Sequence, residues 1–146
     1  MIRPALAAAI LSLGILAVGC TSPDGKLEGA NALRHQGRSA EALSAYREIL
    51  GDLGDGTIPK WETGVRLRAL RYAADVSYLD LGDYAGAVGY YRRIVSLYPG
   101  TDDAWKARAA IGDIYAQRLG DRQAAIAQYA AIAQGDAKEA PRYQLL

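Results

Sequence analysis

Apolar residues recur at three- and four-residue steps over residues 78–99, on both sides of a Gly82-Asp83 break. This spacing places apolar side chains along one face of a helix. Glycine followed by aspartate favours a turn between two helices. The stretch therefore predicts a helical hairpin, in which the end of one helix is followed by a tight turn and an antiparallel second helix.

A similar pattern occurs in residues 35–50 and again in residues 118–133, so the hairpin is a repeating unit. The sequence predicts an all-α fold of stacked helical hairpins. The expected elements are a first hairpin over residues 27–50 with its turn at 36–38, a loop over 51–57, helices over 61–81, 84–98, 103–119 and 122–134, and a further helix that begins within 137–146.

The N-terminal residues 1–20 have the proportions of a secretory signal. One positive charge, on Arg3, precedes residues 5–18, which carry no charge. That run is too short to cross a bilayer of about 30 Å. Cys20 closes the run and is the one cysteine of the chain, so it forms no internal disulfide. A single histidine without a second cysteine cannot make a tetrahedral site by itself, so no structural zinc is expected.

Ala17-Val18-Gly19-Cys20 resembles the lipobox of bacterial lipoproteins. The resemblance implies a signal peptide at 1–19, cleavage before Cys20, and a diacylglycerol and an acyl chain attached covalently to that cysteine. No other cofactor is expected. Two or more lipid chains anchor a protein stably to the membrane, although the protein itself does not span the bilayer. Thr21 follows the cysteine, which favours the outer membrane by the family's sorting rule. The alternative is an ordinary helix with a free core cysteine.

The mature chain then divides into a lipidated N-terminus and tether at 20–26 and a repeat domain at 27–146. Within this domain the middle repeat resembles the tetratricopeptide repeat, a unit of about 34 residues. Its motif positions are Tyr78, Gly82, Tyr84, Ala87, Tyr91 and Pro99. The first repeat supplies Leu33, Gly37, Ala42, Tyr46 and Ile49, and the third supplies Gly112, Tyr115, Gly120, Ala125, Tyr129 and Ile132.

The resemblance implies a right-handed superhelix of about three repeats plus a C-terminal capping or truncated helix. The alanines are expected where two helices cross closely, and the tyrosines Tyr46, Tyr91 and Tyr129 between one hairpin and the next. Glycines at the turns suit a positive φ. The chain is similar to bacterial envelope lipoproteins and periplasmic proteins with such repeats, including the β-barrel assembly lipoprotein and the TolA-binding cell-division coordinator.

Catalytic signatures are absent from the sequence: it has no G-x-S-x-G, no H-E-x-x-H and no phosphate-binding glycine loop. We therefore expect no enzyme activity and no small-molecule substrate. His35 is interpreted as a solvated or capping residue. Acid pairs are suggested by Asp80, Asp83, Asp102, Asp103 and Asp113. Structural use is favoured over acid–base chemistry, because Asp83 and the Asp102-Asp103 pair fit turns and helix starts.

Charge gives no indication of a nucleic-acid partner. Removal of the signal peptide removes Arg3 and lowers the number of basic side chains from 17 to 16. This equals the 16 acidic side chains, so the mature chain has no net charge. A basic patch for lipid headgroups or a partner remains an alternative to ordinary solvated helix faces. Its candidates are Arg66, Arg68, Arg71, Arg92 and Arg93.

The resemblance implies that the first helix of each hairpin lines a concave groove suited to an extended peptide or a helix. The expected groove residues are Asn31, Arg34, His35, Tyr72, Val76, Leu79, Asp80, Lys106, Asp113 and Gln117. A receptor for chaperone C-termini is disfavoured, since only Asn31 and Lys106 match its carboxylate clamp. Other clamp positions hold Leu27, Ala73 and Ala110.

The combined expectation is a lipid-anchored periplasmic scaffold that binds protein partners of a cell-envelope assembly, on the periplasmic face of the outer membrane. One alternative is an assembly or stabilising lipoprotein of a secretion or pilus machine. Another is a non-catalytic fragment or subunit of a larger enzyme complex.

Overall fold

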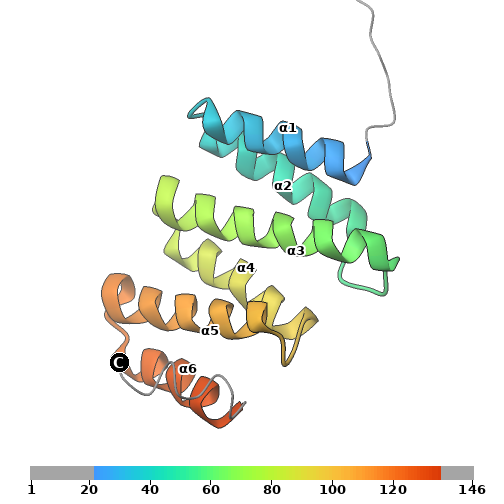
Figure 1. Ribbon diagram of the computed structural model, residues 1–146. Coiled ribbons are helices and arrows are strands. Elements are labelled where there is room, and N and C mark those ends of the chain that lie inside the picture. The colour runs from blue at the N-terminus through green and yellow to red at the C-terminus, as the bar shows by residue number, and fades with distance from the viewer. Residues whose placement is uncertain (1–21, 136–146) are drawn as a thin grey trace, which may run out of the picture.

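The computed structural model describes residues 22–135, which form a stack of helices arranged in antiparallel pairs (Figure 1). The elements, in chain order, are α1 (Pro23–His35), α2 (Ser39–Leu53), α3 (Lys60–Asp75), η1 (Val76–Asp80), α4 (Tyr84–Leu97), α5 (Asp102–Ile114), η2 (Tyr115–Leu119) and α6 (Arg122–Gly135). No strand occurs in this part of the chain, and the expected all-α hairpin fold is confirmed.

Each helix packs against the helices next to it in the chain, from α1 through α6. The helices α1, α3 and α5 open the three hairpins, and α2, α4 and α6 close them. The first helices α1 and α3 also contact each other, so the first two hairpins meet on the side of their first helices as well. The signal peptide, the lipobox at Cys20 and the helix expected within residues 137–146 lie outside the described residues.

Both outer boundaries of the first hairpin differ from the sequence prediction. α1 begins at Pro23, because the Ser22 hydroxyl accepts a hydrogen bond from the Gly25 N–H at 3.2 Å and proline suits the first helical position. Residues 23–26 therefore belong to the first helix and not to the tether. α2 continues to Leu53, so residues 51–53 are helical and the connecting loop is confined to 54–59.

The three hairpin turns confirm the expected role of glycine. Gly37, Gly82 and Gly120 have φ angles of 76°, 65° and 69°, a region that side-chain-bearing residues rarely adopt. The two later first helices end in a π-helical turn, η1 and η2, immediately before this region. A π turn rotates the residues it contains relative to the preceding α-helix, which changes the side each of them faces.

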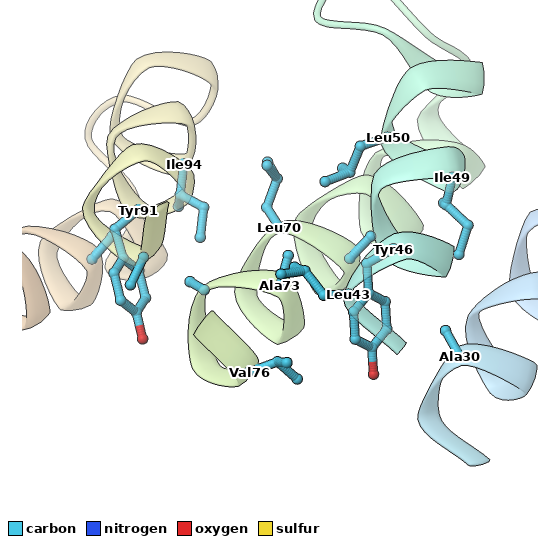
Figure 2. Packing of buried hydrophobic residues seen from close by; sticks show 14 of the residues in the cluster. Ala30, Leu43, Tyr46, Ile49, Leu50, Leu70, Ala73, Val76, Tyr91 and Ile94 are labelled. Carbon is cyan, nitrogen blue, oxygen red and sulfur yellow. The ribbon is translucent and has the colours of Figure 1, made fainter. Parts of the chain in front are cut away.

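Small residues and tyrosines build the contacts between helices. Ala42 and Ala87 are fully buried and Ala125 is 2% exposed, as expected for close crossings. Tyr46 is fully buried, and the centroid of its ring lies 5.9 Å from the ring centroid of Tyr72 in the next hairpin. Figure 2 shows Tyr46 and Tyr91 among the aliphatic residues of this core.

Arg66 is a charged residue within a largely apolar core, since it is only 6% exposed. Its guanidinium donates hydrogen bonds to the carbonyls of Gly54 and Gly56, at 3.2 and 2.7 Å, and to the Tyr98 hydroxyl, at 3.0 Å. Buried charge is tolerated where its donors are satisfied. Arg66 thereby fixes the loop 54–59 between the first two hairpins.

Candidate functional site

A pocket lies where the first helices of hairpins one and two meet. Its volume is about 640 Å³. Its lining residues are Asn31, Arg34, His35, Gly37, Ser39, Tyr72 and Asp80. We call it the α1/α3 pocket. Five of these seven residues are groove residues expected from the sequence, and the pocket brings together residues about forty positions apart in the chain.

An ion pair forms one wall of the α1/α3 pocket. The Arg34 guanidinium donates to both carboxylate oxygens of Asp80, at 2.9 and 3.3 Å, and the Ser39 hydroxyl donates to the same carboxylate at 3.1 Å. The hydrogen bond from Arg34, aided by that from Ser39, lowers the pKa of Asp80. Asp80 raises the pKa of Arg34 in return. Both groups therefore remain charged at neutral pH.

The floor of this pocket combines an amide with aromatic surface. The carbonyl oxygen of the Asn31 side chain accepts a hydrogen bond from the Tyr46 hydroxyl at 2.6 Å, which fixes the amide. The Tyr72 ring packs against Tyr46 and carries the Arg71 guanidinium 5.6 Å above it. Fixed polar groups beside an aromatic surface suit a peptide, whose backbone needs hydrogen bonds and whose side chains need apolar contact.

A second, smaller pocket of about 160 Å³ lies between hairpins two and three. Its lining residues are Arg71, Asp75, Tyr91, Ile94, Asp103, Lys106, Ala107 and Ala110. The Tyr91 hydroxyl donates to Asp75 at 2.7 Å, and burial of the phenol, reinforced by this carboxylate, raises the pKa of Tyr91. Lys106 forms an ion pair with Asp102 on the rim.

The remaining expected groove residues are placed differently. Val76 is fully buried in the core, so its prediction as a partner-binding residue is wrong. Leu79 is 66% exposed and Gln117 is exposed, but neither lines the two pockets above. The Asp113 carboxylate accepts a hydrogen bond from the Tyr129 hydroxyl at 2.6 Å. Asp113 therefore makes a structural contact within the third hairpin.

Several pocket residues were missed by the sequence prediction, notably Ser39, Asp75 and Asp103. A signal for Asp75 existed in the spacing. Asp75 precedes Tyr91 by 16 residues, and Asp113 precedes Tyr129 by the same number. Each aspartate accepts a hydrogen bond from the hydroxyl of its tyrosine, which lies on the second helix of the same hairpin. A recurring carboxylate–tyrosine pair at one spacing indicates a shared contact between the two helices of a hairpin.

The arginines considered as a basic patch have separate partners in the structure. Arg66 is buried, Arg68 pairs with Asp24 at 2.5 Å, and Arg93 pairs with Asp55. Arg92 donates to the Tyr115 hydroxyl at 2.7 Å. These contacts favour structural and solvated roles over a common surface for lipid headgroups.

Two further findings concern residues 22–135. No helix there is both long and apolar enough to cross a membrane. Within the same residues no group of three or more His, Cys, Asp or Glu side chains is arranged to hold a metal ion.

A family model, tetratricopeptide repeat, matches residues 67–111. This segment begins in α3, includes α4 and ends in α5, so it contains most of the second hairpin and the start of the third. No curated protein matches the chain. The match and the hairpin stack support a tetratricopeptide-repeat protein, a class whose concave surfaces generally bind other proteins.

Proposed function

We propose that the chain is a lipid-anchored periplasmic scaffold that holds a protein partner of a cell-envelope assembly in the α1/α3 pocket. The observation that carries the binding role is this pocket itself, which gathers side chains of two hairpins around a fixed amide and an aromatic ring. The proposed partner segment is an extended peptide or a helix. No catalytic role is part of the proposal.

The pocket favours a peptide because its polar groups are already ordered. Arg34, Asp80 and Asn31 all have hydrogen-bond partners within the protein, so a ligand meets a preformed surface. Preformed groups lose little conformational entropy when a partner binds. His35, at the end of α1, is exposed on the rim and adds a further polar contact.

The pocket is tested by affinity capture from bacterial membranes. The variants His35→Glu and Tyr72→Ala alter its rim and floor, and Ser44→Glu, an exposed position on α2 outside the pocket, is the matched control. We expect the two pocket variants to lose the captured partner while Ser44→Glu keeps it. Retention by all three variants, with folded protein shown by circular dichroism, would contradict the proposal.

The anchor is tested separately. The proposal rests on the lipobox ending at Cys20 and on the polar residues that follow it. Cys20→Ala is expected to prevent lipidation and cleavage and so to alter both the apparent size and the membrane extraction of the protein. A variant of unchanged size that remains membrane-bound would show that the lipobox has another role. The captured proteins then distinguish an envelope assembly from a secretion or pilus machine.

A further inference from the structure

Trp61 is a large apolar side chain that the helical stack leaves in solvent. It lies in the first turn of α3 and is 65% exposed, whereas Trp105 of α5 is half-buried. Ile58 and Pro59 precede it in the connecting loop, and its neighbour Lys60 is exposed. A tryptophan combines an apolar ring with a polar N–H, and this combination suits the boundary between a membrane and water.

The backbone that carries this indole is fixed. Arg66 donates to the carbonyls of Gly54 and Gly56, and the Pro59 carbonyl accepts a hydrogen bond from the Glu62 N–H at 2.9 Å. The loop 54–59 and the first turn of α3 are thereby held in one arrangement. A side chain presented from fixed backbone needs little further ordering when it meets a surface.

The start of α1 lies on the same edge of the stack. Arg68 follows Trp61 by seven residues, or two helical turns, so both lie on one side of α3. The Arg68 guanidinium pairs with Asp24 in the first turn of α1, at 2.5 Å. Figure 1 shows the start of α1 and the loop before α3 at the same end of their hairpins. We call this side, defined by Pro23 and residues 54–61, the loop edge.

The position of Cys20 in the sequence gives the loop edge a neighbour. Cys20 precedes Pro23 by three residues, and three residues span at most about 11 Å. A lipid on this cysteine, as in the proposed function, would hold the loop edge close to the bilayer. A second contact beside an anchored point forms readily, because the local concentration of the two surfaces is high.

We propose that the loop edge rests on the membrane that carries the lipid anchor, with the Trp61 indole at the level of the lipid headgroups. This inference rests on the anchor of the proposed function. The α1/α3 pocket lies at the other end of α1, where it includes Arg34 and His35. Since α1 has 13 residues and a length of about 20 Å, the pocket is held that far from the headgroups and open to a protein partner.

The charges near the loop edge are compatible with a lipid surface. Three aspartates are held in ion pairs with basic side chains: Asp24 with Arg68, Asp52 with Lys26, and Asp55 with Arg93. Lys60 is exposed and has no carboxylate partner within residues 22–135, so its ammonium can meet a lipid phosphate. Glu62 is the acid of the first turn of α3, where the helix N-terminus favours its charge.

Fluorescence quenching in vesicles tests the proposal. The full protein is purified from bacterial membranes with Trp105→Phe, which leaves Trp61 as the one tryptophan, and is reconstituted into vesicles of phosphatidylethanolamine and phosphatidylglycerol. Bromine atoms on the acyl chains quench an indole that lies at the interface. We expect brominated lipid to lower the emission of Trp61 by roughly half.

The matched control moves the tryptophan to the other end of the same helical segment. Leu79 is 66% exposed, close to the 65% of Trp61, and lies in η1 at the turn end of the hairpin. The protein with Trp61→Ala, Leu79→Trp and Trp105→Phe should show no quenching by the same lipid. Because Trp61 and Leu79 are both exposed, neither change is expected to unfold the stack, and circular dichroism checks this.

Mass spectrometry of Cys20 in the same samples separates this inference from the proposed function. An unmodified Cys20 would contradict the anchor and this inference together. In a lipidated protein, an unquenched Trp61, or equal quenching of the tryptophans at 61 and 79, would overturn this inference alone. An unquenched Trp61 whose replacement by alanine abolishes capture of the partner would assign the indole to a protein contact instead.

Discussion

Asp80 at the end of the second hairpin's first helix accepts two hydrogen bonds from Arg34 in the first hairpin, with distances of 2.9 and 3.3 Å. The same carboxylate accepts a hydrogen bond from the hydroxyl of Ser39, the first residue of α2. α4 and α6 have capping aspartates within their own hairpins, at Asp83 and Asp121, whereas α2 has Arg38 at this position and no side-chain cap. Asp80 therefore places a negative charge at the N-terminus of α2 from the neighbouring hairpin.

The Arg34–Asp80 contact is expected to couple the two hairpins energetically. The two side chains are 26% and 25% exposed, so solvent screens the pair only in part. In a double-mutant cycle with Arg34→Gln and Asp80→Asn, we expect a coupling free energy of about 0.5–1 kcal/mol from urea unfolding. Strictly additive single-variant effects would show that the bridge adds no stability.

The pH dependence of stability follows from the same carboxylate. The hydrogen bond from Arg34 lowers the pKa of Asp80, so the folded state binds its proton more weakly than the unfolded state. The stabilisation is thus present above the unfolded pKa of about 4 and is lost as pH falls through the lower folded pKa. The stability difference between the parent and Asp80→Asn should shrink between pH 5 and 2, and a constant difference would contradict this assignment.

The buried phenol–carboxylate pair of the second hairpin should contribute more than its counterpart in the third. Tyr91 is 8% exposed and donates to Asp75, whereas Tyr129 makes the same kind of bond to Asp113 with its ring half-buried. We expect Tyr91→Phe to lower the free energy of unfolding by about 1–2 kcal/mol, and Tyr129→Phe by less. Thermal and urea unfolding measure both, and the reverse order would show that burial does not decide the effect.

Removal of the Arg66 guanidinium should release the loop between the first two hairpins. Arg66→Met leaves the carbonyls of Gly54 and Gly56 without these donors. We expect a loss of roughly 2–3 kcal/mol and faster amide hydrogen exchange in residues 54–59. Arg68→Met is the control, because Arg68 is exposed and pairs with Asp24. Unchanged exchange in the loop would mean that other contacts hold it.

The repeating positions could be predicted because each has one physical requirement. A close helix crossing requires a small side chain at Ala42 and Ala87, and a positive φ favours glycine at Gly37 and Gly82. These requirements are local and leave a visible spacing in the sequence. The hairpins and most helix boundaries follow from them.

Val76 could not be placed by the same reasoning. The family resemblance implied that positions 76, 79 and 80 all face the groove, which fits a regular α-helix, where they share one side. Val76–Asp80 instead forms a π-helical turn, and the wider turn leaves Val76 in the core while Leu79 and Asp80 face outward. The buried Arg66 was missed for a different reason, since its acceptors are loop carbonyls that no side-chain pattern records.

The central claim is that the α1/α3 pocket receives a protein partner. Photo-crosslinking from a reactive amino acid placed at position 35, on the pocket rim, or at position 44, on the exposed side of α2, tests it in intact cells. We predict a discrete crosslinked protein from position 35 that is absent from position 44. The same crosslinked protein at equal yield from both positions, or none from position 35, would contradict the claim.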